Sequence, residues 1–208
     1  TSSLNRIRLE GFALNDSACL INTMVVGVGR FGINVITEIM ERQFDGITRT
    51  ISVDTDSNAL ARSNANINIQ LGDGSRSEGN PDIARILAWN QREEILQAIH
   101  GSNMVIIVAG LGGGTNSGAT HVIAKLAKQS GALTVVLANI ASDQGKPQML
   151  IAEKWLRRIQ RQSDTVVKIT VTRKSALEVV QGTQRFGTAD SIEQSLNTIN
   201  GLSMIHNN

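Results

Sequence analysis

The chain has 208 residues, 41% hydrophobic and 18% charged, so it can bury the core of one large domain or two small ones. A net charge of +2 and only 3% aromatic residues provide neither the basic groove nor the stacking platform of a single-strand binder, and we expect no nucleic-acid partner. Cys19 is the only cysteine. This excludes a disulfide framework and a cysteine metal cluster, and we expect a cytoplasmic protein.

Apolar strands and amphipathic helices alternate along most of the chain. Residues 1–19 are weakly patterned and are expected to form an N-terminal extension, followed by one domain over residues 20–208. A buried strand at 24–28 is followed by helical spacing of apolar residues over 32–43. We expect further strands at 50–53, 66–71, 104–109, 133–137 and 165–171, and further helices at 80–101, 117–130, 147–162 and 188–205.

This alternation predicts an α/β fold of Rossmann-like type, with a parallel sheet and helices on both faces. Ligands of such folds bind at the carboxyl ends of the strands, where the glycines of this sequence lie. The longest apolar run, residues 104–109, is far too short to cross a bilayer, so we expect no transmembrane segment.

The first glycine-rich turn spans Gly27 to Gly32 and reads G-x-G-x-x-G between a predicted strand and a predicted helix. Glycine lets backbone N–H groups approach an anion, and the N-terminus of the helix adds positive partial charge. Asp54 ends the second strand about twenty residues later, where a dinucleotide-binding fold holds a ribose. This region alone predicts an NAD-binding domain.

The second glycine-rich turn, Gly110 to Gly118, also follows a strand and opens a helix. Its glycines and small polar residues form a loop of backbone donors and hydroxyls, which is suited to a diphosphate or triphosphate. The chain lacks the G-x-x-x-x-G-K-[ST] pattern of a Walker-type loop, and neither turn contains lysine. Neutralisation of the phosphates would therefore depend on backbone dipoles and bound Mg²⁺.

The segment Gly112 to Gly118 resembles the G-G-G-T-G-[ST]-G signature of the FtsZ/tubulin GTPases. Residues 26–34 are similar to the first glycine loop of that family, Val53 to Leu60 to its N-T-D-x-x-A-L segment, and Phe186 to Asp190 to the start of its central helix. The matches keep the family's order and cover roughly residues 22–205. The resemblance implies a nucleotide-binding domain of the tubulin/FtsZ type.

The resemblance implies GTP or GDP with Mg²⁺ as ligands, and a homo-oligomer, a filament or other FtsZ-family proteins as partners. Asp56 would lie near the terminal phosphate and a metal-bound water, and Asp190 would accept hydrogen bonds from guanine. No catalytic residue and no direct protein ligand of the metal is assigned. The implied nucleotide-binding residues are Gly29, Gly32, Asn34, Asp56, Gly112, Gly113, Gly114, Thr115, Asn116, Ser117, Gly118, Gln144 and Asp190.

Two departures from the family pattern lie in the glycine turns. Arg30, Phe31 and Ile33 replace three glycines of the first loop, so their side chains must point away from the ligand or the loop must sit differently. Asn116 replaces a glycine of the signature, and the turn is expected to survive because Asn tolerates left-handed backbone angles.

Further departures concern the base, the ribose and hydrolysis. Gln144 stands where the family has Glu, which implies a weaker ribose contact, and residues 171–173 lack the family's base-recognising Asn-Asp. The sequence ends at Asn208, where the family continues with an acidic catalytic loop and a second domain. If the chain is whole, we expect slow or no hydrolysis and no ordinary filament; if it is a fragment, the missing half explains the difference.

Three functions remain open from the sequence: an assembling GTPase, a GTP- or GDP-holding module without turnover, and an NAD-binding domain. Several residues also have a structural interpretation. Asp54 and Asp56 can cap the next helix. The Arg157, Arg158 and Arg161 cluster is either a solvated helix face or a patch that meets a partner. We expect Trp89 and Trp155 in the core or an interface, and no metal site at His100, His121 and His206.

Overall fold

The computed structural model describes residues 21–44, 46–74, 79–141 and 145–169. The predictions for the N-terminal extension, for Gln144, and for the last helix with Asp190 lie outside the described residues.

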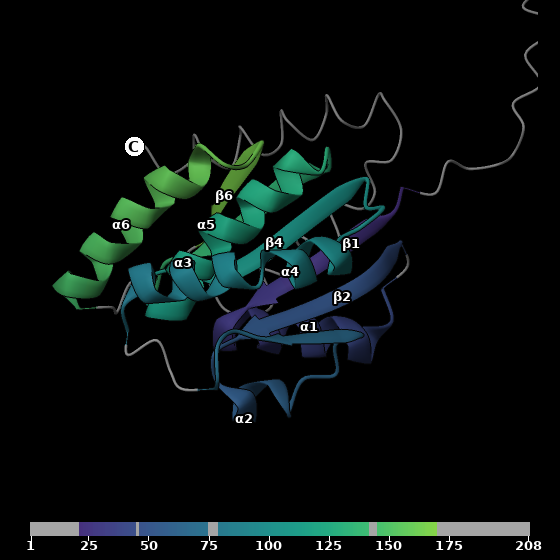
Figure 1. The fold of residues 1–208 in the computed structure, drawn as a ribbon, viewed down its shortest axis with the longest axis horizontal. Coiled ribbons are helices and arrows are strands. Elements are labelled where there is room, and N and C mark those ends of the chain that lie inside the picture. Colours follow the sequence, from purple (N-terminus) through teal and green to yellow (C-terminus); the bar gives the residue numbers. More distant parts are fainter. Residues whose placement is uncertain (1–20, 45, 75–78, 142–144, 170–208) are drawn as a thin grey trace, which may run out of the picture.

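The described chain contains one sheet of six strands, in which all neighbouring strands pair in parallel in the order β3-β2-β1-β4-β5-β6 (Figure 1). The predicted α/β class and parallel sheet are confirmed. The strands are β1 (Thr23–Val28), β2 (Ile47–Asp54), β3 (Ile67–Gln70), β4 (Met104–Gly110), β5 (Leu133–Asn139) and β6 (Thr165–Ile169).

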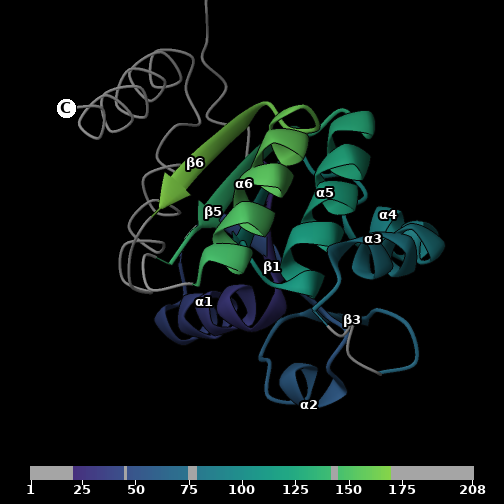
Figure 2. The ribbon, with the colours of Figure 1, turned by 90° about the vertical axis from the view of Figure 1, so that its left-hand side faces the viewer.

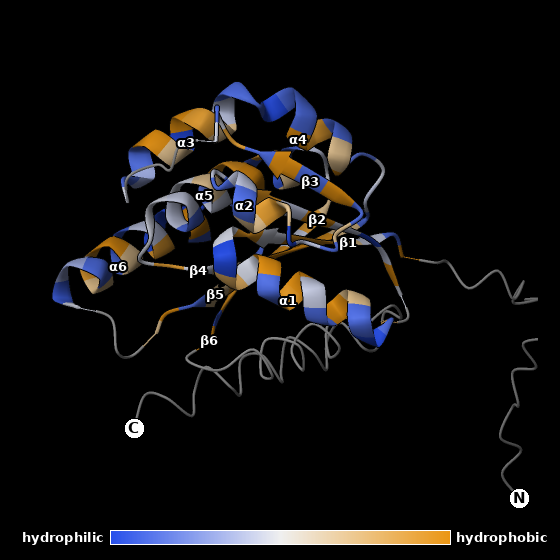
Figure 3. Ribbon diagram, turned by 90° about the horizontal axis from the view of Figure 1, so that it is seen from below, coloured by the Kyte–Doolittle hydropathy of each residue, from blue (hydrophilic) through white to orange (hydrophobic). Residues whose placement is uncertain are grey.

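Helices cover both faces of this sheet, as the alternation predicted (Figures 2 and 3). Side chains on one face, such as Val25 and Ile106, pack with α1, while their neighbours Val26 and Ile107 pack toward α3 to α6. This alternation is the two-residue period of a strand that is buried on both sides. The helices are α1 (Gly29–Arg42), α2 (Ser57–Leu60), α3 (Pro81–Asn90), α4 (Arg92–Ala98), α5 (Gly114–Gln129) and α6 (Lys146–Gln160).

The helix predicted over residues 80–101 is two helices, α3 and α4, which meet at Gln91. Its start agrees with the predicted range. The Asn80 side chain caps the helix by accepting a hydrogen bond from the N–H of Asp82, and Pro81 occupies the first turn. At the break, the Gln91 amide donates to the carbonyl of Gln70 and accepts from the N–H of Gly72 at 2.8 Å. These tertiary contacts fix Gln91 outside helical geometry, and periodicity alone carries no sign of them.

The strand order reverses direction between β1 and β4, because β2 and β3 extend the sheet on one side and β5 and β6 on the other. β1 and β4 pair directly from Thr23 opposite Met104 to Val28 opposite Ala109. The turns that follow these strands therefore leave the same sheet edge side by side. Such a reversal is where open α/β sheets form their ligand crevice.

Candidate functional site

The first glycine turn is shaped by close packing of α1 on the sheet. A side chain at Gly27 would collide with the backbone of Gly32 and with Ile36, and one at Gly32 would collide with the carbonyl of Val108 on β4. Gly32 is buried, and neither it nor Asn34 borders the crevice described below. Their predicted contact with phosphate stays a prediction, but packing alone already requires these two glycines.

The second turn leads into α5, whose N-cap is Gly113. The N–H of Gly112 donates to the Ser117 hydroxyl at 3.3 Å, and that side chain is fully buried. Gly118 lies beneath α3, where any side chain would collide with the carbonyl of Pro81. Ser117 and Gly118 thus hold the turn and its neighbouring helix in place, and the residues before them border the crevice.

Asn116 belongs to the second turn, and its side chain reaches the first. A side chain at Gly29 would coincide with the Asn116 carboxamide, and Gly29 has a φ of +69°. The Asn116 amide also lies close to the places where side chains at Gly110 and Gly113 would project. The Asn that replaces a signature glycine is therefore accommodated by the bare backbone of the first turn.

The end of β2 is joined to the second turn by a hydroxyl pair. The Thr55 Oγ1 and Thr115 Oγ1 atoms are 2.9 Å apart, and Thr55 is buried. Asp54, which is 6% exposed, accepts the N–H groups of Thr55 at 2.7 Å and Asp56 at 3.2 Å through one carboxylate oxygen. Burial raises the pKa of Asp54 above its ordinary value, more than these hydrogen bonds and nearby Arg30 lower it.

Asp56 caps the short helix α2 by accepting the N–H of Asn58 at 3.0 Å. The structural interpretation of this residue is therefore confirmed. The cap uses the Oδ1 atom of a half-exposed side chain at the crevice, so it does not test the predicted contact with a metal-bound water.

The two turns and the end of β2 enclose a crevice of about 360 Å³. Five predicted residues border it and lie together there: Asp56, Gly113, Gly114, Thr115 and Asn116. Gly29 and Gly112 lie in the two turns without bordering it. Residues that were not assigned to the nucleotide site also border it: Arg30, Asp54, Thr55, Ala59 and Gly79.

Arg30 is the residue that sequence reasoning missed most clearly. The three replacements in the first loop were expected to point away from the ligand, unless the loop sat differently, and the structure separates them: Ile33 is 5% exposed and Phe31 packs against the core. Arg30 instead is exposed and borders the crevice. Arg30 is the second residue of α1, which begins at Gly29. The predicted helix began at residue 32, which was too late, so Arg30 was not recognised as part of its first turn.

Comparison with protein families matches residues 22–173 to the GTPase domain of the Tubulin/FtsZ family. The chain belongs to the Tubulin/FtsZ family. Cell division protein FtsZ 1 of Methanocaldococcus jannaschii is 34% identical over 186 residues, covering 86% of this chain and 50% of that protein. Cell division protein FtsZ of Buchnera aphidicola subsp. Acyrthosiphon pisum is 34% identical over 150 residues, covering 70% of this chain and 39% of that protein.

Solved structures of the family agree in fold. The empty FtsZ dimer of M. jannaschii superposes with a TM-score of 0.74 at 33% identity, covering 81% of this chain and 56% of that one. CetZ2 of Haloferax volcanii superposes with a TM-score of 0.67 at 20% identity, covering 82% and 59%, which supports the fold alone. The chain thus spans about half the length of the FtsZ proteins it matches.

The described residues add two findings on the Tubulin/FtsZ domain. They contain no group of three or more His, Cys, Asp or Glu side chains that could hold a metal ion by themselves. None of their helices combines the length and the apolar character that crossing a bilayer requires.

The contact between Gly29 and Asn116 predicts a specific stability pattern. Replacing Gly29 by Ala should cost about 1–3 kcal/mol for the positive φ alone, and the overlap with Asn116 should add about 1–3 kcal/mol. Gly131→Ala is the control, because Gly131 has a φ of +86° and open space around it. Urea unfolding should show a larger loss for Gly29→Ala than for Gly131→Ala, and the difference should disappear in an Asn116→Ala background. Equal losses would refute the contact.

Proposed function

We propose that this domain binds GTP and GDP, with the phosphates in the crevice between the two glycine turns. Asp190, which lies outside the described residues, would accept hydrogen bonds from guanine. The observation that carries the proposal is the direct pairing of β1 with β4, which brings both turns to one edge of the sheet. A dinucleotide-binding fold needs only one such turn, and the first turn alone would supply it. The second turn opens α5, whose first N–H groups lack acceptors within the helix and whose dipole favours an anion.

The charges around the crevice support a phosphate ligand accompanied by a cation. Among the described residues that border the crevice, Arg30 has the only basic side chain, and Asp54 and Asp56 supply the carboxyl groups. These carboxyl oxygens and the Thr115 hydroxyl are hard oxygen donors, which suit Mg²⁺. Bound Mg²⁺ would neutralise phosphate charge, and we propose that Asp56 accepts a hydrogen bond from one of its waters.

The burial of Asp54 argues against NAD as the ligand. A ribose-binding carboxylate must be free to accept the sugar hydroxyls. Here one oxygen of Asp54 already accepts two backbone N–H groups of its own turn, and the residue is 6% exposed. We therefore rank guanine nucleotides ahead of NAD as the ligand.

Arg30 provides the sharpest test of nucleotide binding. We expect Arg30→Glu to weaken GTP binding about 10- to 100-fold, because it replaces a charge-assisted contact, worth about 1.5–3 kcal/mol, by repulsion. Calorimetry with GTP, GDP, ATP and NAD on the full chain measures this. Arg157→Glu on the exposed face of α6 is the control with the same charge change. Equal affinities in both variants, or preference for NAD, would contradict the proposal.

We further propose that the domain self-associates and that hydrolysis is slow or depends on assembly, as part of a cytoplasmic filament system of the cell-division type. The FtsZ relatives that it matches are named cell division proteins, and one solved relative is a dimer.

Phosphate release, measured together with light scattering over a range of protein concentrations, should rise more steeply than in proportion to protein when GTP is present. Tight GTP binding with no release at any concentration would instead establish the alternative function, a module that holds the nucleotide without turnover.

A further inference from the structure

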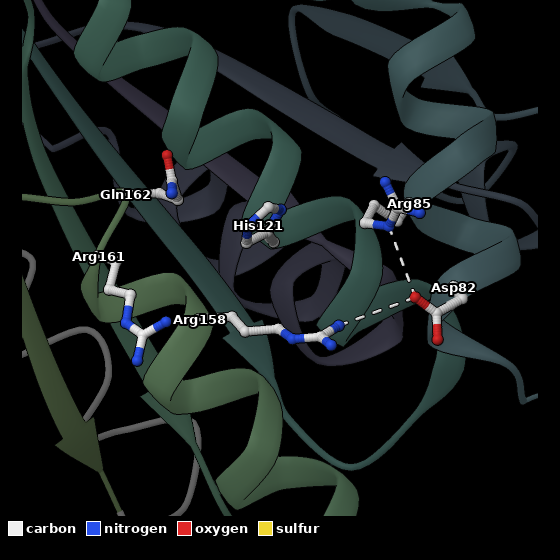
Figure 4. Close-up of a pocket in the computed structure, with 6 residues that line it drawn as sticks. All are labelled: Asp82, Arg85, His121, Arg158, Arg161 and Gln162. Atoms are coloured by element: carbon white, nitrogen blue, oxygen red, sulfur yellow. Dashed lines mark ion pairs between the residues drawn. The ribbon is translucent and has the colours of Figure 1, made fainter.

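A second hollow, of about 340 Å³, is separate from the crevice and lies in the groove where α3, α5 and α6 meet (Figure 4). It lies in the layer formed by these helices, and none of its lining residues borders the nucleotide crevice. Six residues line it: Asp82, Arg85, His121, Arg158, Arg161 and Gln162.

Positive charge in this hollow is not balanced. Three guanidinium groups line it beside a single carboxylate, that of Asp82, whose Oδ1 lies 3.5 Å from Arg85 Nε and 3.8 Å from Arg158 Nη1. Both distances exceed the 2.7–2.9 Å of a strong charge-assisted hydrogen bond. Arg161 makes no ion pair with any described residue. The hollow can therefore accept further oxyanions, and Asp82 shows that Arg85 and Arg158 can share one.

One of the basic side chains, that of Arg158, is held in position by an aromatic contact. The guanidinium carbon of Arg158 lies 4.6 Å from the centre of the Trp155 ring, and Trp155 is 2% exposed. His121 meets the edge of the same ring, with 5.8 Å between the ring centres. Such cation–π contacts orient the guanidinium before any ligand arrives, which reduces the entropy lost on binding.

An apolar hollow of about 160 Å³ continues the groove and shares Arg85 and His121 with the basic one. It is lined by Trp89 and Val122, with the Lys125 ammonium 4.8 Å from the centre of the Trp89 ring. Trp89 is 40% exposed, and one turn away on α3 Ile86 is 51% exposed. Exposed Trp and Arg side chains set beside an apolar hollow are typical of the residues that dominate protein interfaces.

We propose that the groove between α3, α5 and α6 is a docking site for an acidic, partly apolar segment of a partner protein. Carboxylates of that segment bind Arg158 and Arg161, and an apolar side chain packs against Trp89 and Val122. The charge imbalance selects an acidic partner. The apolar extension along α3 favours a peptide over a small free anion, which would leave Ile86 and Trp89 uncovered.

The groove also distinguishes members of the arginine cluster seen in the sequence. Arg158 and Arg161 line the hollow, whereas Arg157 is exposed on α6 outside it. The two interpretations of the cluster therefore apply to different residues: Arg157 lies on a solvated face, and the other two lie in the proposed docking site. Arg157 consequently provides a control on the same helix with the same charge.

The test uses the full chain and a synthetic peptide with Glu on one helical face and Leu on the other, free of Trp and Tyr. Trp89 and Trp155 are the chain's only tryptophans and it has no Tyr, so intrinsic fluorescence reports on this groove and not on the glycine turns. We expect a saturable fluorescence change that weakens at least about tenfold in Arg158→Gln/Arg161→Gln, through loss of two charged contacts, and is unchanged in Arg157→Gln. A peptide with Gln in place of Glu should not bind.

His121 supplies a second, local readout. Burial, followed by the charges of Arg85, Arg158 and Lys125, lowers the pKa of His121, while Asp82 is the acidic side chain lining the same hollow. A bound acidic peptide should raise the pKa of His121, measured by NMR, both in the wild type and in Arg157→Gln. Absence of peptide binding, an equal loss in Arg157→Gln, or equal binding of the Gln peptide would overturn the proposal. Binding of pyrophosphate without peptide binding would also overturn it, by assigning the hollow to a small anion.

Discussion

The parallel pairing of β1 with β4 is the contact on which the candidate site depends. It aligns Val28 with Ala109, so the turns after these two strands begin at the same level of the sheet. Because the strand order reverses between them, the helices that follow them, α1 and α5, pack on opposite faces of the sheet and leave a crevice between the two turns. The Thr55–Thr115 hydroxyl pair then ties the end of β2 to the same place. The crevice is thus a consequence of topology first and of side-chain chemistry second.

Glycines in this site serve the fold as well as a ligand. Gly32 and Gly118 allow helices to approach neighbouring backbone more closely than any side chain permits. Gly29 has the further task of making room for Asn116. A substitution within the family signature is therefore matched by the geometry of the other turn. This explains how the signature tolerates Asn at a position where the resemblance implies glycine.

The sheet and the helices on both its faces could be predicted from the sequence, because fully apolar strands and strong caps such as Asn80 act locally. The break at Gln91 could not, since it depends on contacts with Gln70 and Gly72 from another part of the chain. In the site, the positions of the glycine turns could be predicted from their motifs. That Arg30 borders the crevice could not, because it depends on α1 beginning at Gly29. The basic groove arises only when α3 and α6 meet on α5.

The central claim is that both glycine turns hold the phosphates of one nucleotide, and hydrogen exchange of the full chain with and without GDP and Mg²⁺ tests it most directly. The account predicts slower exchange of the amides in residues 29–32 and 112–116 together, with no change around Trp89 and His121. Slower exchange confined to the first turn would contradict it and would indicate a dinucleotide-type site. Unchanged exchange in both turns would rule out the crevice as a nucleotide site.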